Sequence, residues 1–432
     1  MPKELIIYGY MDKGYNGHGV LVECSIRNGF PGFDITGLPG ASVKEARERV
    51  RCAFRSCGIK LPQSRILVNL SPAGNPKNST LLDLPLACAV LYGQKRKTIP
   101  NTHAGKSVKV MIAGELSLDG HVLEAPQAMG AVEAACRLGC QACILPFSIP
   151  KTHSSLLLVQ ALTLEQAFKI CCNLMNEKTK TEDSAGEKEE IAEPVFEDII
   201  GMEYEKDIVA MAAGGFHSIL LFGPPGVGKT MLCSRINRLL PPMTEQNSTQ
   251  VARILGCAEI GQGRASPENC SRMRILSHDC TQTQFVSGSG AKSPGEGALS
   301  HMGVLLLDEI NKYGPKLIEA VRDAYDSGCT RSSRSGEVIT YPARFLMAGN
   351  MNPCQCAGLG APNSVCTCTA QRLAGHWTRL GRQMIPRFDI RLPVKPRENI
   401  LSLIGSPSQA DSLYIEKIKN AAARQSFRYR YI

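Results

Sequence analysis

The 432-residue sequence contains no uninterrupted hydrophobic run of the roughly 18–20 residues that are needed to cross a bilayer. Its N-terminus, MPKELIIYGYMDKG, lacks the charged segment followed by an apolar segment that is typical of an export signal. Both absences argue against a protein that spans a membrane or is exported. We therefore expect a cytoplasmic protein with no membrane partner.

The sequence also lacks the features of a disulfide-stabilised secreted domain. Its 18 cysteines are spread through a long chain without an export signal, and such a chain is expected to keep its thiols reduced. Charge of one sign is not in strong excess either. The formal net charge of +10 is mild for this length, and a solvated surface explains it. The positive charge also favours a polyanion as the partner.

A polar segment divides the sequence. The length favours two or three domains, and residues 171–194 resemble a linker because almost every residue from Asn176 onward is polar, charged or small. Such a segment cannot bury enough apolar surface to offset the entropy lost on ordering. We therefore predict an N-terminal domain of residues 1–170 and a second domain of residues 195–400, followed by residues 401–432.

The N-terminal half alternates strand-like with helix-like patterns, which predicts an α/β or α+β domain. Its clearest helix, at residues 43–57, has apolar residues that recur at helical spacing between charged ones. These apolar residues are Val43, Ala46, Val50, Ala53 and Phe54. The other predicted elements are strands at residues 21–26, 66–70 and 110–113 and a helix at residues 84–91.

The second half begins with a predicted helix at residues 204–213, which is followed by a buried strand at residues 218–222 and a helix at residues 229–239. Two more buried strands are expected at residues 304–307 and 345–348. Strands that alternate with helices predict a parallel sheet with helices on both faces. The fold class predicted for this half is therefore α/β.

The strand at residues 218–222 leads into a loop that matches the P-loop pattern G-x-x-x-x-G-K-[ST] at every fixed position. Glycines let such a loop wrap around phosphates, and the following helix presents its positive N-terminus to the anion. The lysine is expected to reach the β- and γ-phosphates of ATP, and the threonine hydroxyl to bind Mg²⁺. The predicted ATP-binding residues are Gly223, Pro224, Pro225, Gly226, Val227, Gly228, Lys229 and Thr230.

An acidic pair, Asp308 and Glu309, follows the predicted strand at residues 304–307. Ligands bind at the carboxyl ends of strands in open α/β sheets, so we expect this pair at the same edge as the P-loop. Asp308 is expected to hold Mg²⁺ through water, and Glu309 to polarise the attacking water as a general base. Most Asp-Glu pairs are simply solvated, but this one follows a P-loop on a buried strand and so predicts an ATPase.

Two further residues are candidates for the hydrolytic site. Asn352 follows the predicted strand at residues 345–348 and could position the attacking water, with Asn350 as the alternative. Asn352 could instead only form the turn before Pro353. Arg387 could supply the cation that stabilises charge on the transferred phosphoryl group, often from a neighbouring subunit, or it could be an ordinary surface arginine.

The pairs Cys354-x-Cys356 and Cys366-x-Cys368 place four thiols in a short segment. Two close pairs of thiolates can enclose a tetrahedral Zn²⁺, although this spacing is tighter than the usual C-x₂-C. The glycine-rich loop between the pairs is too short to pack a core of its own, which favours a metal. Ordinary reduced cysteines are the alternative.

Basic residues gather in the second half. Residues 371–397 carry seven Lys and Arg against one acid, Asp389. Arg331 and Arg334 flank the expected tip of a hairpin, after which a strand pattern resumes at residues 338–341. An exposed loop whose charges aid solubility explains both arginines; the resemblance to ring ATPases described next implies instead that they contact DNA.

At these residues the second half resembles an AAA+ ATPase of the magnesium-chelatase-like clade. Three stretches narrow the resemblance to the YifB/ComM family, whose members are often named magnesium chelatase-like competence proteins. The resemblance covers nearly the whole chain in order. The three stretches are GLPGASVKEARERVR at residues 37–51, VNLSPA at residues 68–73, and MNPCQC at residues 351–356 with CTCT at residues 366–369.

The resemblance implies that the N-terminal domain is similar to the C-terminal fold of Lon protease, an α+β domain like domain 2 of ribosomal protein S5. The segment GELSLDG at residues 114–120 carries this likeness. A Lon nucleophile would be a serine in a Pro-Lys-Asp-Gly-Pro-Ser-type segment, a pattern that PKNSTLLD at residues 76–83 lacks. We therefore expect Ser79 not to act as a protease nucleophile and the domain to serve in binding or assembly.

The resemblance further implies a homo-hexameric ring in which Arg387 acts on the ATP site of a neighbouring subunit. ComM-type members resemble DNA helicases that drive branch migration, so single-stranded or branched DNA is the expected partner. Residues 377–386 depart from the family's Ser-Gly-Pro-Leu-Leu-Asp pattern. Residues 415–430 resemble the first helix of a C-terminal helical lid, which is expected to be truncated at Ile432.

We therefore predict an ATP-hydrolysing AAA+ ring motor that uses ATP and Mg²⁺ and acts on DNA during recombination of incoming DNA. A magnesium chelatase-type motor subunit and a non-hydrolysing ATP-dependent scaffold are the alternatives. The Lon-like domain favours the first function over the chelatase motor, because chelatase motor subunits generally lack such a domain.

Overall fold

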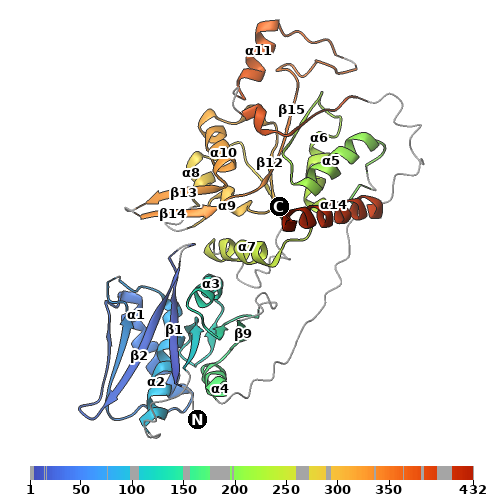
Figure 1. The fold of residues 1–432 in the computed structure, drawn as a ribbon. Helices are drawn as coiled ribbons and strands as arrows, with labels where there is room; N and C mark the ends of the chain where they lie inside the picture. Colours follow the sequence, from blue (N-terminus) through green and yellow to red (C-terminus); the bar gives the residue numbers. More distant parts are fainter. Residues whose placement is uncertain are drawn as a thin grey trace. The chain divides into compact units, whose positions relative to one another are not determined.

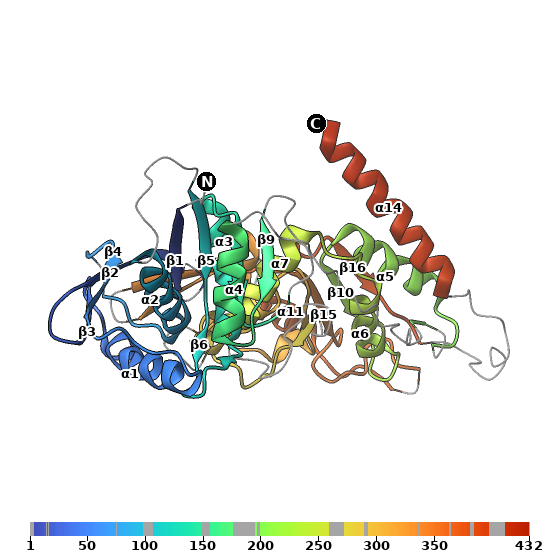
Figure 2. The same ribbon diagram turned by 90° about the horizontal axis from the view of Figure 1, so that it is seen from below.

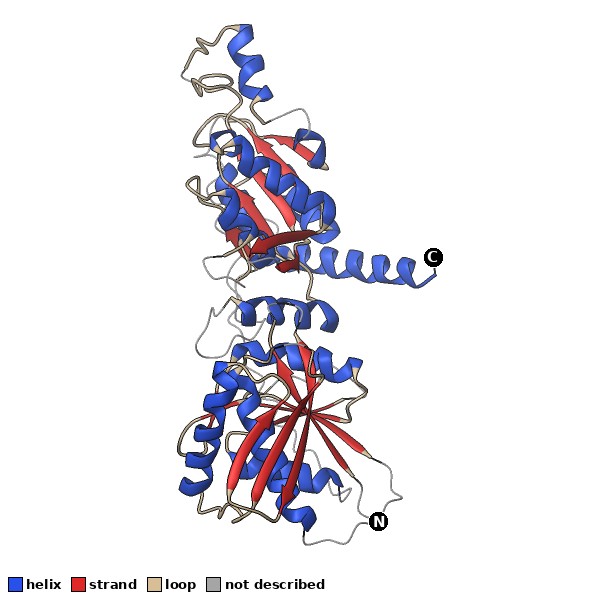
Figure 3. Ribbon diagram, turned by 90° about the vertical axis from the view of Figure 1, so that its left-hand side faces the viewer, coloured by secondary structure: helices blue, strands red, loops and turns tan. Residues whose placement is uncertain are grey.

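The computed structural model forms two compact units, Met1–Glu187 with Ala252–Ser266, and Lys188–Val251 with Pro267–Ile432. Each unit contains a β-sheet flanked by helices (Figure 3). The described residues are 4–13, 15, 17–74, 76–97, 107–148, 156–175, 195–196, 199–258, 272–288, 293–334, 337–362, 364–380, 384–396 and 411–431.

The sheet of the first unit has seven strands in the order β3-β4-β2-β1-β5-β8-β9. Three of them, β1, β2 and β9, are labelled in Figure 1. β1 pairs antiparallel with β2 and parallel with β5, so the sheet is mixed. This confirms the predicted mixture of strands and helices in the N-terminal half. The strands are β1 (Leu5–Met11), β2 (His18–Arg27), β3 (Gly32–Thr36), β4 (Arg65–Ser71), β5 (Val108–Ile112), β8 (Ala142–Leu145) and β9 (Leu157–Gln160).

Helices cover both faces of this sheet. α1 (Ala41–Ser56), α2 (Asp83–Lys97) and α4 (Leu164–Met175) bury their apolar sides in one core, whereas α3 (Gly130–Arg137) packs in a second core on the opposite face. The five residues predicted for the buried side of the first helix are the five that α1 buries. Alternation in the strands explains the two cores, because successive side chains of a strand point to opposite faces.

The predicted start of the linker is wrong by five residues. α4 continues through Met175, and Cys171 is fully buried in the core of the first unit. Apolar packing of the last helical turns therefore extends the domain beyond residue 170. The rest of the predicted linker, residues 176–194, lies outside the described residues.

The end of α7 (Glu245–Cys257), which the sequence assigned to the second domain, completes the first unit. Arg253 is 5% exposed and forms an ion pair with Glu133 of α3. Its guanidinium carbon also lies 4.0 Å from the centroid of the Tyr15 ring. A cation that is both paired and stacked on an aromatic ring tolerates this burial.

Ser79, the serine considered as a protease nucleophile, donates its hydroxyl proton to Asp12 Oδ1. Lys77 is fully buried, and its Nζ donates to Gly37 O at 2.8 Å and to Pro72 O. The ammonium group is thus occupied with backbone carbonyls and is not a base for Ser79. That the domain has no protease nucleophile stays a prediction, as does its likeness to the Lon fold.

The sheet of the second unit has five parallel strands in the order β11-β12-β15-β10-β16. The predicted parallel sheet is therefore confirmed. β10 lies between β15 and β16, which come much later in the chain, so the strand order reverses at β10. The strands are β10 (Ile219–Phe222), β11 (Met273–Ile275), β12 (Val304–Leu307), β15 (Leu346–Met351) and β16 (Ile390–Pro393).

Two cores lie on the two faces of this sheet. α5 (Glu203–Gly215), α6 (Lys229–Leu239) and α14 (Asp411–Tyr431) pack on one face (Figure 2), and α8 (Gln282–Val286) and α10 (Pro315–Ser327) on the other. The predicted helix at residues 415–430 is present as part of α14, where the fully buried ring of Tyr414 packs edge-on against Phe196. In the described part of the chain, no helix is both long enough and apolar enough to cross a membrane.

His301 is a buried histidine that precedes β12. It is 5% exposed; its Nδ1 accepts a hydrogen bond from the Arg344 backbone N–H at 3.1 Å, and its Nε2 lies 3.0 Å from Gln250 Oε1. Only the neutral imidazole can accept at Nδ1 and donate at Nε2. Burial, with a smaller contribution from the Arg344 charge, lowers the pKa of His301 to about 4.

This depressed pKa predicts a loss of stability in acid. Between about pH 6.5 and pH 4 the unfolded chain binds a proton at His301 that the folded chain does not. The free energy of unfolding therefore decreases as the pH is lowered through that window. The full loss is about 3 kcal/mol. Urea unfolding followed by Trp377 fluorescence should therefore show a weaker dependence on pH for His301→Gln than for the wild type. His217→Gln, which changes an exposed histidine, should keep the wild-type dependence; equal slopes in all three proteins would contradict the assignment.

Candidate functional site

The P-loop connects β10 to α6 and needs its glycines for geometric reasons. Gly226 and Gly228 have φ angles of 80° and 87°, a left-handed region that side chains with a Cβ rarely adopt. A Cβ on Gly223 would lie 2.1 Å from Val394 O of the neighbouring chain segment. The sequence folds into this loop because glycine is present at each of these positions.

Lys229, the first residue of α6, folds back over this loop. Its Nζ donates to Gly223 O and Pro224 O, both at 2.7 Å, and to Asn352 Oδ1 at 3.1 Å. The residue is 8% exposed, and burial lowers its pKa, although the charges of Glu309 and Asp308 oppose this effect. Lys229 is thus an almost buried cation that three oxygens hold at the P-loop.

The oxygens predicted to hold Mg²⁺ lie side by side. Thr230 Oγ1 and Asp308 Oδ1 are 3.1 Å apart. Oxygens bound to an octahedral Mg²⁺ at roughly 2.1 Å from the metal lie about 3 Å apart. A hydroxyl that can bind the ion, beside a carboxylate that can hold a metal-bound water, is a set of hard oxygen groups of the kind that Mg²⁺ prefers, so the residues present fit the ion.

Asn350 links the members of the site more closely than the sequence indicated. Its side chain is 1% exposed; Nδ2 donates to Asp308 Oδ1 and to Thr230 Oγ1, and Oδ1 accepts from the Glu309 backbone N–H at 2.9 Å. β15 extends to Met351, three residues beyond the predicted strand, so Asn350 lies within the strand. The structure therefore brings both asparagines to the site: Asn350 against the acidic pair, and Asn352 against Lys229.

Glu309 has an unusual backbone conformation, with φ 47° and ψ 59°. This left-handed conformation is costly for a residue other than glycine, and such strain is often found at functional sites. The hydrogen bond from its backbone N–H to Asn350 holds it in place. Its carboxylate forms an ion pair with Lys312 one turn later.

Sequence reasoning missed two residues of α11 (Ala370–Thr378), which contact the backbone carbonyls of Asn352 and Pro353. His376 Nε2 lies 2.8 Å from Asn352 O, and Trp377 Nε1 donates to Pro353 O at 3.1 Å. The Trp377 ring also packs edge-on against Phe222, the residue before the P-loop, with 5.5 Å between ring centroids. The sequence signal for Trp377 was that it is the only tryptophan in the chain.

Arg387 does not join this cluster within its own chain. It lies three residues before β16, and Ser218, which precedes β10, donates its hydroxyl proton to Arg387 O. Because β10 and β16 run parallel, Arg387 lies at the amino end of the sheet, about 13 Å of strand away from the P-loop. Its guanidinium forms two hydrogen bonds to Asp326, at 3.1 and 2.8 Å, and this carboxylate raises the pKa of Arg387.

The expected hairpin is present as β13 (Cys329–Arg334) and β14 (Glu337–Pro342). Its strands reach further toward the turn than predicted. Arg334 pairs with Glu337 beside the turn, whereas Arg331 lies inside β13 opposite Thr340 and is exposed. The prediction that Arg331 flanks the tip is therefore wrong, because the pairing of the two strands continues past it.

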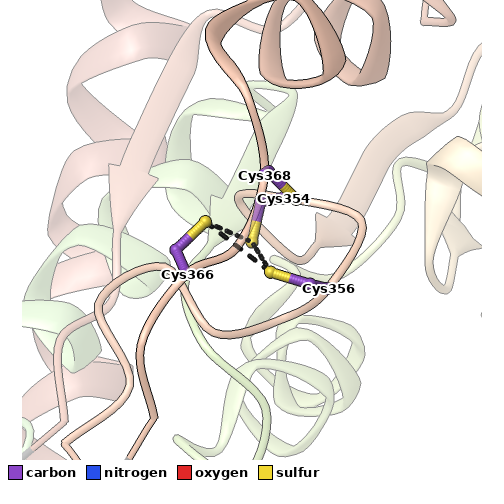
Figure 4. A group of neighbouring side chains, drawn as sticks. All are labelled: Cys354, Cys356, Cys366 and Cys368. Atoms are coloured by element: carbon purple, nitrogen blue, oxygen red, sulfur yellow. Dashed lines mark hydrogen bonds between the residues drawn. The ribbon is translucent and has the colours of Figure 1, made fainter.

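Four sulfur atoms converge between β15 and α11 (Figure 4). This group of four residues, the cysteine cluster, has all its sulfurs within 4.8 Å of one another. The distance from Cys354 Sγ is 3.4 Å to Cys356 Sγ and 3.8 Å to Cys366 Sγ, and the last two are 3.6 Å apart. The members are Cys354, Cys356, Cys366 and Cys368.

The parallel sheet, the P-loop and the acidic pair define a P-loop protein of the AAA+ class. Comparison with known families agrees: residues 195–401 match the family described as "Magnesium chelatase, subunit ChlI", and residues 22–149 match "Subunit ChlI of Mg-chelatase". Membership of this class implies use of ATP and Mg²⁺. The chain belongs to the YifB/ComM family within it.

Proteins of the YifB/ComM family match most of the chain, and a chelatase subunit matches a smaller part. Protein YifB of Salmonella typhimurium is 32% identical over 419 residues, which are 95% of this chain and 80% of YifB. Competence protein ComM of Haemophilus influenzae is 30% identical over 411 residues, or 91% of this chain and 77% of ComM. The magnesium-chelatase 38 kDa subunit of Cereibacter sphaeroides is 26% identical over only 174 residues, or 37% of this chain and 52% of the subunit.

Proposed function

We propose that this protein is an ATP-hydrolysing ring motor that acts on DNA. The observation that carries the proposal is the convergence of Lys229, Thr230, Asp308 and Glu309, linked by Asn350, at the carboxyl edge of the parallel sheet. This arrangement offers a cation for phosphate in Lys229, two oxygens for Mg²⁺ in Thr230 and Asp308, and a carboxylate for water activation in Glu309. Kinship with ComM, a protein named for competence, supports DNA as the substrate of the motor.

Each side chain has a defined task in this proposal. Lys229 would exchange its two carbonyls and Asn352 for phosphate oxygens. Thr230 and Asp308 would hold Mg²⁺, which when bound would neutralise charge on the phosphates. Glu309 acts as the general base, which requires its carboxylate to leave Lys312 and turn toward the attacking water.

Replacement of the base should separate ATP binding from hydrolysis. Glu309→Gln keeps the shape of the side chain but cannot accept the proton, so hydrolysis should fall by about 10²–10⁴-fold while ATP binding persists. Lys229→Ala removes the cation and should abolish binding. The measurements are phosphate release and Trp377 fluorescence during ATP titration. Glu319→Gln, which changes an exposed carboxylate of α10, should behave as wild type; equal turnover by Glu309→Gln and wild type would refute the role of Glu309.

The position of Arg387 favours a ring in which subunits share sites. Its own P-loop lies at the far end of β10, so it can reach phosphate only in a neighbouring subunit. Its pairing with Asp326 keeps the guanidinium at that edge of the sheet. A heterologous interface of this kind closes into a ring when the rotation between subunits allows it, and the resemblance predicts six subunits.

Mixing two inactive variants tests whether Arg387 acts across subunits. Arg387→Ala and Glu309→Gln should each be inactive alone. In a one-to-one mixed assembly, about a quarter of the interfaces join an intact Glu309 to an intact Arg387 of the neighbour, so phosphate release should recover to about that fraction of wild type. Arg322→Ala mixed with Glu309→Gln provides the reference for dilution. No recovery in a mixture shown by mass to contain both variants would exclude action across subunits.

The hairpin is the proposed contact with DNA. Arg331 is exposed on β13, and Arg334 lies at the end of that strand. A motor that moves along DNA must hold any sequence, and phosphate contacts give affinity without sequence information. We therefore assign both arginines to the sugar-phosphate backbone rather than to base edges.

Salt dependence provides the test. Replacing Arg331 and Arg334 by alanine should weaken binding equally on two unrelated DNA sequences. It should also reduce the slope of log affinity against log salt by about 0.7–0.9 for each arginine that no longer neutralises a phosphate. Fluorescence anisotropy at several salt concentrations measures both effects. Arg47→Ala with Arg51→Ala removes the same charge from the exposed side of α1 and should leave the slope unchanged; a hairpin variant with the wild-type slope would show that the hairpin does not contact phosphate.

A magnesium chelatase-type motor is the second candidate, and the similarity to the 38 kDa chelatase subunit supports it. That similarity covers 37% of this chain, whereas those to YifB and ComM extend over more than nine-tenths. The extent of the match therefore favours the DNA motor. ATP turnover that DNA does not stimulate, together with no effect of the hairpin variant, would favour the chelatase motor or a non-hydrolysing scaffold.

A further inference from the structure

We propose that the cysteine cluster binds one zinc ion and thereby positions Asn352 against Lys229. The metal site does not depend on the proposed ATPase function. Its effect on hydrolysis rests on the proposed ATPase function. Each part is therefore given its own measurement.

The sulfur positions fit a single tetrahedral ion. Four thiolates at about 2.3 Å from a zinc ion are about 3.8 Å from one another. The separations among Cys354, Cys356 and Cys366 are 3.4, 3.6 and 3.8 Å, and no pair of the four sulfurs is more than 4.8 Å apart. A disulfide requires about 2.05 Å, so these cysteines are not disulfide-bonded. A polynuclear iron–sulfur cluster would hold its thiolates further apart, which leaves a mononuclear site.

The loop that carries the cluster has little apolar core to hold it. Most of the described residues between Cys354 and Thr369 are exposed, including Val365 at 86% and Leu359 at 39%, whereas Cys354 is 1% exposed. Thiols form only weak hydrogen bonds with one another, so four of them do not order a polar loop by themselves. The Leu359 backbone N–H donates to Cys354 Sγ at 3.3 Å, as expected for a sulfur that carries negative charge toward a metal.

The cluster is directly connected to the phosphate site. Cys354 is two residues after Asn352, whose Oδ1 accepts from Lys229 Nζ at 3.1 Å. On the other side of the loop, Thr369 caps the N-terminus of α11, the helix whose His376 lies 2.8 Å from Asn352 O. The loop also passes close to the P-loop, since a Cβ on Gly360 would lie 4.0 Å from Pro224 Cδ.

One of the two chain segments that leave the cluster thus carries Asn352, and the other contacts it through His376. A metal that fixes the four sulfurs fixes the start of α11 relative to the end of β15. The backbone of Asn352 is held by the end of β15 on one side and by α11 on the other. Loss of the ion would free α11 and so remove the second of these supports. Because a displacement of about 1 Å costs up to roughly a hundredfold in rate, the ion acts on hydrolysis by positioning Asn352, without touching ATP itself.

The first measurement is metal content. The full chain, purified with reductant and without chelator, should contain about one equivalent of zinc by elemental analysis. Cys356→Ser with Cys366→Ser changes two partly exposed ligands and should contain almost none. Cys52→Ser with Cys136→Ser, which changes two cysteines of the first unit, should retain the wild-type content. Replacement of zinc by cobalt should give the visible spectrum of a tetrahedral thiolate site.

The second measurement is hydrogen exchange in the absence of nucleotide. The Cys356→Ser, Cys366→Ser variant should exchange faster than the wild type at β15 and α11. It should exchange at the wild-type rate in α10, and this unchanged rate would show that the unit is folded. If the protein hydrolyses ATP, the same variant should bind ATP within about threefold of wild type but hydrolyse it about tenfold to a hundredfold more slowly. Asn352→Ala should show the same slow hydrolysis while it retains zinc.

Different outcomes overturn different parts of the proposal. Wild-type protein that contains less than about a fifth of an equivalent after incubation with zinc, or that yields disulfides at these cysteines after alkylation under denaturing conditions, has no zinc site. Zinc loss with unchanged exchange in β15 and α11 refutes the positioning of Asn352. If the wild type binds zinc and the variant exchanges faster at β15 and α11, but the wild type does not hydrolyse ATP, the proposed ATPase function is refuted and the metal site is supported.

Discussion

The parallel pairing of β10, β12 and β15 is the constraint on which the rest of the site depends. In this pairing Phe222 lies opposite Met351, and Leu307 lies opposite Gly349. The residues that follow these positions must therefore emerge at one edge of the sheet. Hydrogen bonding between strands sets the register, and the register brings together groups such as Lys229 and Asn352, which are 123 residues apart in the chain.

At that edge of the sheet, polar contacts rather than apolar packing hold the side chains in place. Asn350 joins Asp308, Glu309 and Thr230, and Lys229 joins the P-loop to Asn352. Buried polar groups that are fully paired specify one arrangement more strictly than apolar contacts do. This explains why Glu309 can be held in a left-handed conformation that is costly for its residue type.

The opposite edge of the sheet has a different character. Arg387 is fixed there by Asp326 and by the Ser218 hydroxyl, both remote from the chain's own phosphate loop. A chain that presents its nucleotide site at one edge and an arginine at the other has two unlike surfaces. Such surfaces suit a heterologous interface between copies of the chain, and this is the physical basis for the proposed ring.

The sequence by itself determined the P-loop, the acidic pair, the parallel sheet and the buried side of α1, because each depends on residues close together in the chain. It predicted α6 and β12 to the residue. It did not determine the central role of Asn350, the support of Asn352 by His376 and Trp377, the continuation of α4 through Met175 or the extent of the hairpin strands. Those features depend on contacts between distant segments, and only the register of the strands and the packing of helices on them decided which side chains meet.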